Sequence, residues 1–360
     1  MDSRIQNLAR TLVRYSVHAK PKEMISVDGT TEAEPLILAV YEELIKAGAF
    51  PILRMAPSAA SGLFYKYGQA HHFDETTPFQ RMFVRTVHGT IGIAASPNTR
   101  ALSNVDPKKQ VRVSKANKPL REILMKKKWC ITLFPTQAYA QDAEMSLADF
   151  EDFVYRATFA DRDDPIAAWK ALARRQEKLI ARIRGKHTVR IVGPETDLTM
   201  SIKGRTFISS AGHHNMPCGE FFTGPVEDSA EGHIRYDFPV CEGGREIDGI
   251  RLVFRKGKVV EASAEKNEKY FLSMLDMDPG ARRLGELGIG TNYGIQKFIK
   301  NILFDEKIGG TVHLALGESY PETGGKNKSA LHWDMIKDLR KGGSLYVDGR
   351  LFQKNGKFVN

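Results

Sequence analysis

The chain has 360 residues, of which 42% are hydrophobic and 27% are charged, and its formal net charge is +10 at pH 7. This length suits two domains, and this composition supports ordinary globular cores. No run of about 18 apolar residues is present, which argues against a membrane span, and the charged N-terminus lacks the continuous apolar stretch of a secretory signal. The longest basic run is Lys126 to Lys128, so we expect a solvated surface rather than a nucleic-acid partner.

The cysteines are few and scattered along the chain. Cys130, Cys218 and Cys241 form an odd set without C-x-x-C spacing, and none carries a nucleophile signature. Because disulfides are rare in reducing compartments, this pattern predicts a cytoplasmic protein.

Short apolar runs alternate with amphipathic segments through the first half of the chain. The expected strands are residues 24–27, 52–55, 90–95 and 129–134, and the expected helices are residues 5–17, 32–47, 63–71, 120–127, 147–160 and 166–184. Strands and helices that alternate at this spacing predict a mainly parallel sheet covered by helices.

The pattern changes after Arg184, where short strands are separated by Gly, Pro and Asp. RKGKVV and QKNGKFV are hairpin signals, and helices are expected only at residues 266–275 and 295–303. We therefore predict an α/β N-terminal domain, residues 1–186, and a β-rich α+β catalytic domain, residues 187–360.

The segment from residue 305 to residue 334 is rich in residue types that bind metals. His332 and Asp334 form an H-x-D pair, and in a strand two such side chains leave the same face about 7 Å apart along the chain. His313 lies in TVHLALG, which is typical of a second strand. Nitrogen and oxygen ligands from separate strands are how proteins hold a catalytic divalent metal. This combination indicates a metalloenzyme.

Carboxylates and a tyrosine accompany these histidines in apolar or glycine-rich segments. Glu286 in LGELGIG is the clearest case, because a buried carboxylate must be paired or metal-bound. Glu220 follows NMPCG, Glu306 precedes the strand of His313, and Tyr320 precedes a proline. Taken singly, each residue also suits a hydrogen-bonded core position, a turn or a rim. The residues alone therefore leave both the metal site and these structural roles open.

Other catalytic signatures are missing from the sequence. GGKNKS resembles a phosphate loop but lacks the G-x-x-x-x-G-K-[ST] spacing, and no G-x-S-x-G elbow occurs. Nucleotide binding and serine-hydrolase chemistry are therefore not expected.

Several long motifs resemble the M29 family of metalloaminopeptidases, the group of thermophilic aminopeptidase, aminopeptidase T and leucyl aminopeptidase-like enzymes. They are NMPCGEFFTGPVEDSAEG, LGELGIGTN, DEKIGGTVHLALGESYPETGGKNKSALHWDMI and YVDG, together with TTEAEPLILAVYEELIKAGAFP near the N-terminus. The resemblance covers most of the chain and is weakest between Pro57 and Phe150.

The resemblance implies a homodimeric enzyme with two divalent metal ions, of Zn, Co, Mn or Mg. The metal ligands that it implies are Glu220, Glu286, Glu306, His313, His332 and Asp334. It gives catalytic roles to Glu220, Glu286 and Tyr320, with Glu286 as the bridging ligand. Cys218 departs from the family pattern, because an acidic residue is expected before Gly219.

The implied activity is hydrolysis of the N-terminal amide bond of peptides or aminoacyl amides by a water activated between two metals. The alternative is a ring-cleaving dioxygenase of the dihydroxypyridine type on the same scaffold. Its single non-haem iron would be held by His313, His332 and Asp334. Retention of Glu220 and Glu286 favours the hydrolase, since one iron needs fewer carboxylates. A non-catalytic basic binding protein is a third hypothesis, which strongly salt-dependent nucleic-acid binding would reveal.

Overall fold

The computed structural model describes residues 2–242 and 245–359. The chain divides into two compact units, residues 1–169 with 212–217 and residues 170–211 with 218–360. The division passes inside helix α9 (Pro165–Ile183), whereas the sequence places a boundary between residues 186 and 187. The start of α9 belongs to the first unit because Trp169 packs against Phe159 and donates a hydrogen bond to the carbonyl of Thr158. Folding of residues 1–186 and 187–360 as separate domains stays a prediction.

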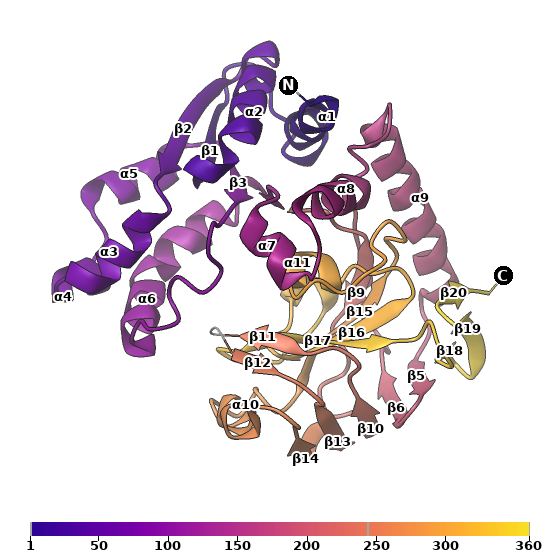
Figure 1. The fold of residues 1–360 in the computed structure, drawn as a ribbon. Coiled ribbons are helices and arrows are strands. Elements are labelled where there is room, and N and C mark those ends of the chain that lie inside the picture. Colours follow the sequence, from indigo (N-terminus) through magenta and orange to yellow (C-terminus); the bar gives the residue numbers. More distant parts are fainter. Residues whose placement is uncertain (1, 243–244, 360) are drawn as a thin grey trace. The chain divides into compact units, whose positions relative to one another are not determined.

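The first unit is built on a parallel sheet with the strand order β2-β1-β3-β4-β8. Figure 1 labels β2, β1 and β3 of this sheet. Its strands are β1 (Met24–Thr30), β2 (Phe50–Ala56), β3 (Gly89–Ala94), β4 (Lys128–Leu133) and β8 (Asn215–Met216). Parallel strands need crossover connections, which helices supply here. Helix α2 packs against β1 and β2, and α1 packs against α2. The predicted parallel sheet with covering helices is confirmed.

Most helices of the protein belong to this unit. They are α1 (Ser3–Thr11), α2 (Glu34–Lys46), α3 (Ala59–Tyr67), α4 (Ala70–Asp74), α5 (Pro78–Thr86), α6 (Pro107–Leu124), α7 (Gln137–Asp142) and α8 (Leu147–Ala157), with a π-helical turn at Leu12–Ser16 and a 3-10 turn at Thr31–Ala33. Among the described residues, no helix combines the length and the apolar character that crossing a membrane requires.

The second unit contains two larger antiparallel sheets and one hairpin. The eight-stranded sheet has the order β14-β13-β10-β6-β5-β18-β19-β20, the five-stranded sheet has the order β17-β16-β15-β9-β7, and β11 pairs with β12. The strands are β5 (Thr188–Gly193), β6 (Thr196–Ser201), β7 (Ile208–Ser210), β9 (Glu220–Thr223), β10 (Glu231–Arg235), β11 (Val240–Glu242), β12 (Arg245–Ile247), β13 (Arg251–Arg255), β14 (Lys258–Ser263), β15 (Leu284–Gly290), β16 (Thr311–Gly317), β17 (His332–Asp338), β18 (Ser344–Val347), β19 (Arg350–Lys354) and β20 (Lys357–Phe358). Both predicted hairpins form, as β13–β14 and β19–β20.

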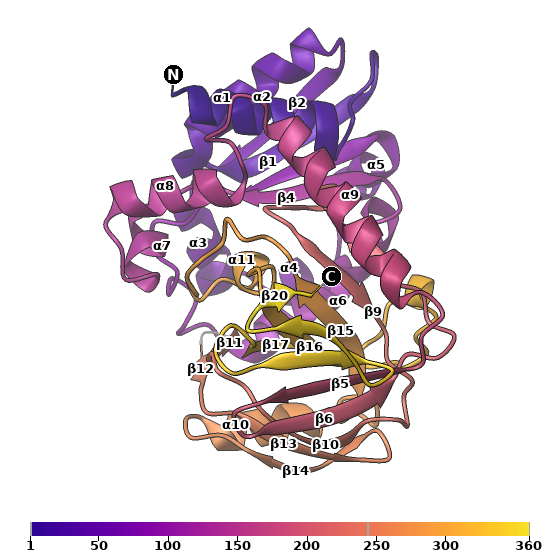
Figure 2. The ribbon, with the colours of Figure 1, turned by 90° about the vertical axis from the view of Figure 1, so that its right-hand side faces the viewer.

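One hydrophobic core serves both sheets of the second unit. It includes Ile191 and Leu198 from the eight-stranded sheet and Leu287 and Leu314 from the five-stranded sheet. In Figure 2, β15 to β17 and the strands β5, β6, β10, β13 and β14 form separate layers. This arrangement buries one face of the five-stranded sheet against the other sheet.

The opposite face of the five-stranded sheet carries the polar residues of interest. The side chains that enter the core include Leu287, Ile289, Val312, Leu314, Leu316, Trp333 and Met335. Because side chains alternate along a strand, the residues between them point to the other face. That face presents Glu286 from β15, His313 from β16, and His332 and Asp334 from β17.

One helix expected in the second half of the chain differs from the structure. The helix predicted for residues 295–303 is wrong, because α11 covers only Ile302–Asp305. The carboxylate of Asp305 accepts hydrogen bonds from the N–H groups of Ile299 and Asn301, and Lys300 has a φ of 61°. These contacts hold the preceding loop outside the helix. The helix expected at residues 266–275 is confirmed as α10 (Glu268–Leu275), whereas α5 and α7 were not predicted.

Candidate metal centre

Four neighbouring strands bring five of the six predicted ligands together, and Glu306 follows helix α11. Strand pairing places Glu220 opposite Gly290, His313 opposite Gly288, and Asp334 opposite Ala315. A β-carbon at Gly288 would overlap the imidazole of His313. The glycine in LGELGIG therefore leaves the space in which that imidazole lies.

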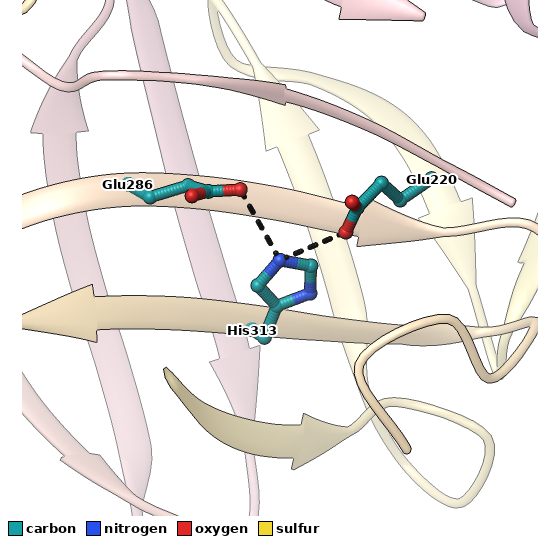
Figure 3. Close-up of side chains that lie close together, drawn as sticks. All are labelled: Glu220, Glu286 and His313. Carbon is teal, nitrogen blue, oxygen red and sulfur yellow. Dashed lines mark hydrogen bonds and ion pairs between the residues drawn. The ribbon is translucent and has the colours of Figure 1, made fainter. Parts of the chain in front are cut away.

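The imidazole of His313 lies between two glutamates (Figure 3). Its Nε2 atom is 3.1 Å from Glu220 Oε2 and 3.4 Å from Glu286 Oε1. All three side chains are buried. Burial by itself would raise the pKa of Glu286, but hydrogen bonds from His313 and His332 lower it to about 2. Glu286 is therefore a carboxylate at neutral pH.

The second histidine is oriented by a backbone carbonyl. His332 Nδ1 lies 2.9 Å from the carbonyl oxygen of Glu318, whereas its Nε2 is 3.4 Å from Glu286 Oε2 and 3.5 Å from Asp334 Oδ2. A metal-binding histidine commonly uses one ring nitrogen for such an anchoring hydrogen bond and the other for the metal. This geometry suits a ligand.

Three overlapping groups of side chains have ligand atoms within 4.8 Å of one another. They are Glu220–Glu286–His313, Glu286–His332–Asp334 and Glu306–His313–Asp334. Within residues 2–242 and 245–359, no hydrogen-bond partner is found for the buried atoms Glu220 Oε2, His313 Nδ1 and Asp334 Oδ1. Buried polar atoms normally have partners. Oxygen and imidazole donors with free capacity fit a divalent ion such as Zn, Co or Mn.

A buried lysine next to this cluster was missed by the sequence analysis. Lys307 Nζ is 2.6 Å from Glu220 Oε1 and also contacts Glu306 Oε1, and its side chain is only 1% exposed. Burial would lower the pKa of Lys307, but the carboxylates of Glu220 and Glu306 raise it well above its usual value. The ammonium therefore stays charged. The signal was present in FDEKIGG, where the lysine precedes Ile-Gly-Gly.

The remaining carboxylates of the centre repel one another. Burial raises the pKa of Glu306 to about 7, with Lys307 opposing the rise and the charges of Asp334 and Glu220 adding to it. Burial also raises the pKa of Asp334, partly offset by His332. Crowded carboxylates of this kind are stabilised by a cation among them.

Tyr320 lies at the more exposed side of the centre. Its ring centroid is 5.1 Å from that of His332 and 5.4 Å from that of Phe222, and the residue is 41% exposed. Burial of the hydroxyl and the nearby Glu286 carboxylate raise the pKa of Tyr320. The hydroxyl therefore keeps its proton and can donate a hydrogen bond.

The departure at Cys218 affects the surroundings of the ligands. Its buried Sγ is 2.9 Å from Ser210 Oγ, and its carbonyl accepts a hydrogen bond from Asn292 Nδ2. Cys218 belongs to none of the three groups that could hold a metal. All six predicted ligands belong to at least one of these groups, and Tyr320 lies beside them.

The sequence profile described as thermophilic metalloprotease (M29) matches residues 1–358. Aminopeptidase 2 of Geobacillus stearothermophilus is 28% identical, over 89% of this chain and 84% of that protein. Aminopeptidase T of Thermus thermophilus is 27% identical, over 96% of this chain and 95% of that protein.

Two solved structures have similar folds. Wild-type AmpT from Thermus thermophilus superposes with a TM-score of 0.86 at 25% identity, and the match covers 99% of both chains. The 2,5-dihydroxypyridine dioxygenase of Pseudomonas putida has a TM-score of 0.58 at 14% identity, over 100% of this chain and 98% of that one. The second likeness concerns the fold alone. From the profile match across almost its whole length, the chain belongs to the thermophilic metalloprotease (M29) family and is a metal-dependent peptide hydrolase.

Proposed function

We propose that this chain is an aminopeptidase that uses two divalent ions to hydrolyse the N-terminal amide bond of peptides. The observation that carries the proposal is the position of Glu286. Its Oε1 faces His313 and its Oε2 faces His332, each at 3.4 Å. A carboxylate whose two oxygens face separate histidines suits a bridge between two ions. The aminopeptidase names of the relatives support the same activity.

The proposed ligand set divides between two positions. Glu220 and His313 would hold one ion, and His332 and Asp334 would hold the other. Glu286 would bind both ions. Glu306 would complete the site through its group with His313 and Asp334. Bound divalent ions would polarise the scissile carbonyl and lower the pKa of the attacking water.

The side chains of the protein perform the remaining steps. Glu220 or Glu286 accepts the proton of the attacking water and transfers it to the leaving amine. Tyr320 donates a hydrogen bond to the oxyanion that develops on the carbonyl carbon. The strands that carry Glu220 and Glu286 are paired and both side chains are buried, so these two groups are held in position before substrate binds.

A chelator experiment tests this function. Protein stripped of metal should lose hydrolysis of aminoacyl p-nitroanilides and regain it with Zn, Co or Mn, and elemental analysis should find two ions per chain. N-acetylated substrates are the matched control, because they lack the free amine and should not be cleaved. Full activity of Glu286→Ala would contradict the proposal.

The dioxygenase alternative rests on a likeness of fold alone. One iron in a facial triad needs two histidines and one carboxylate, whereas four carboxylates occur in the groups around His313 and His332. One iron per chain, with oxygen consumption on a dihydroxypyridine, would favour this alternative.

The proposed homodimer has a candidate surface on the first unit. Strand β2 is an edge strand, and apolar side chains are exposed on it and on the neighbouring α2. They are Leu38, Tyr41, Ile45, Phe50, Leu53 and Met55. Exposed apolar patches and open edges commonly mark interfaces. Light scattering on the wild type and on Leu53→Lys tests whether the chain forms a dimer through this surface.

A cytoplasmic location stays a prediction.

A further inference from the structure

The loop between strands β16 and β17 has a proposed functional group near each end. Tyr320 lies close to the end of β16, and His332 is the first residue of β17. Residues 318–331 contain a 3-10 turn at Pro321–Thr323 and no strand. Because this loop lacks a ladder of backbone hydrogen bonds, other contacts must satisfy its buried polar groups and fix its course.

Asn327 joins this loop to two neighbouring segments of the second unit. The residue is 9% exposed, and its Nδ2 donates hydrogen bonds to the carbonyl oxygens of Gly317 at 2.6 Å and Gly280 at 2.9 Å. Its own carbonyl accepts from the N–H of Ser319 at 3.0 Å. Gly317 ends β16, and Gly280 lies in the loop before β15. One buried residue therefore connects three segments of the chain.

The residue after Gly317 orients the imidazole of His332. The carbonyl oxygen of Glu318 lies 2.9 Å from His332 Nδ1. A β-carbon at Gly285 would overlap this carbonyl oxygen, so the carbonyl is tightly enclosed. Asn327 therefore reaches His332 through two consecutive residues, Gly317 and Glu318.

Ser319 connects Asn327 to Tyr320. The N–H of Ser319 donates to the carbonyl of Asn327, and its Oγ donates to the carbonyl of Gly285 at 2.7 Å. Ser319 is 3% exposed and directly precedes Tyr320. Since the backbone is held at Ser319, the side chain of Tyr320 starts from a fixed point, and its ring centroid lies 5.1 Å from that of His332.

The other end of the loop has an anchor of its own. The carboxylate of Asp278 accepts hydrogen bonds from Ser329 Oγ at 2.8 Å and from the N–H of Ala330 at 2.7 Å. These bonds do not involve Asn327. A change at Asn327 should therefore leave the loop attached near Ser329 and release mainly residues 317–320.

We propose that Asn327 is a positioning residue for the hydrolysis. It holds residues 317–320 so that the Glu318 carbonyl orients His332 and the hydroxyl of Tyr320 faces the oxyanion. The inference rests on the proposed aminopeptidase function. A displacement of about 1 Å in a catalytic group can cost about 10²-fold in rate, so a residue that acts only through its neighbours can still control kcat.

Asn327→Asp tests the role, because it removes both donated hydrogen bonds and keeps the size of the side chain. The kcat for leucine p-nitroanilide should fall by about 10–100-fold, with little change in KM. Asn267→Asp is the control. Asn267 Nδ2 also donates to a backbone carbonyl of the second unit, that of Glu246 at 2.7 Å, and its variant should keep the wild-type kcat.

Asn327→Leu removes the same donors without adding charge. It should show a similar fall in kcat, and urea unfolding should confirm that both variants are folded. A fall in Asn327→Asp alone would assign the effect to the new charge and overturn the proposal.

A double-mutant cycle separates positioning from a general loss of stability. In the Tyr320→Phe background no hydroxyl remains to be misplaced. The fall in kcat caused by Asn327→Asp should therefore be smaller there than in the wild type.

Metal binding reports on His332 without any turnover. Titration of stripped Asn327→Asp with Zn against a chromophoric chelator should show an affinity loss of about 10–100-fold for one ion. The affinity for the other ion, and both affinities of Asn267→Asp, should stay unchanged.

The outcomes separate this role from the proposed function. If the metal-loaded wild type cleaves no aminoacyl p-nitroanilide, the proposed function fails and the inference falls with it. If the wild type is active but the Asn327 variants keep its kcat and both metal affinities, only the positioning role is overturned. It is also overturned if the effects of Asn327→Asp and Tyr320→Phe on kcat multiply fully and neither metal affinity changes, because Asn327 would then only stabilise the fold.

Discussion

The ammonium of Lys307 lies 2.6 Å from Glu220 Oε1, and both side chains are almost completely buried, at 1% and 6% exposure. The same ammonium contacts Glu306. Desolvation of an ion pair costs about as much free energy as the pair returns, so stability alone does not explain its position. Lys307 balances negative charge where the proposed ligands converge, and it orients two of them.

We expect Lys307→Met to destabilise the metal-free protein by about 3–5 kcal/mol, because it leaves buried carboxylates without their cation. Urea unfolding of stripped protein measures the loss, and added Zn should recover part of it. Lys337→Met is the matched control, since Lys337 is also 1% exposed and pairs with Asp237 outside the centre. The stability that Lys337→Met loses should not be recovered by added Zn. Equal stability of Lys307→Met and wild type without metal would contradict this role.

Glu286→Ala should reduce metal binding at both positions, whereas Asp334→Ala should reduce it at one. The reason is that Glu286 faces His313 through Oε1 and His332 through Oε2, at 3.4 Å each, whereas Asp334 Oδ2 lies 3.5 Å from His332. Removal of a side chain that binds the metal directly should lower the metal affinity by more than the roughly 10–100-fold that is typical for residues that only hydrogen-bond to the ligands. Titration against a chromophoric chelator measures both constants. If the dissociation constant of the second ion is unchanged in Glu286→Ala, a bridging role for Glu286 is excluded.

The metal-free protein should lose stability as the pH rises from about 6.5 to about 10. Burial would lower the pKa of His332, but Asp334 and Glu286 raise it from 6.5 to about 10 in the folded state. The folded state therefore binds this proton more tightly than the unfolded state does. The contribution of the protonated His332 to the free energy of unfolding is complete below pH 6.5 and disappears above pH 10. Urea unfolding across this range measures the slope. His332→Gln should flatten it, and His233→Gln on β10 should not.

Asp305→Ala should destabilise the fold and loosen the loop that precedes α11. It removes the acceptor for two backbone N–H groups, at about 1–3 kcal/mol for each group left unsatisfied. Urea unfolding measures the free energy, and Asp248→Ala, which removes an exposed carboxylate that accepts from Gly249 N–H, is the control. Wild-type stability of Asp305→Ala would show that the loop is held by other contacts.

Tyr320→Phe should lower kcat by about 10²–10³-fold, the range for loss of one oxyanion donor. KM should change little, because the hydrogen bond strengthens only as charge develops. Steady-state kinetics on leucine p-nitroanilide measure both constants, with Tyr346→Phe on β18 as the control. A change confined to KM would assign Tyr320 to substrate binding.

The strands that carry the ligands could be predicted from the sequence, because alternation and apolar runs are local signals. TVHLALG and the H-x-D segment form β16 and β17 as expected. The helix expected at residues 295–303 failed because the carboxylate of Asp305 holds the loop through backbone donors. Such a contact competes with helix formation without leaving a periodic signal in the sequence.

The sequence by itself determined the residue types of the centre, the strands that hold His313, His332 and Asp334, and, through long motifs, the family. The tertiary structure decided which atoms meet. The two oxygens of Glu286 face different histidines, and Lys307 lies between Glu220 and Glu306. These relationships depend on strand register and on loop packing between segments far apart in the chain. Local residue patterns do not encode either of them.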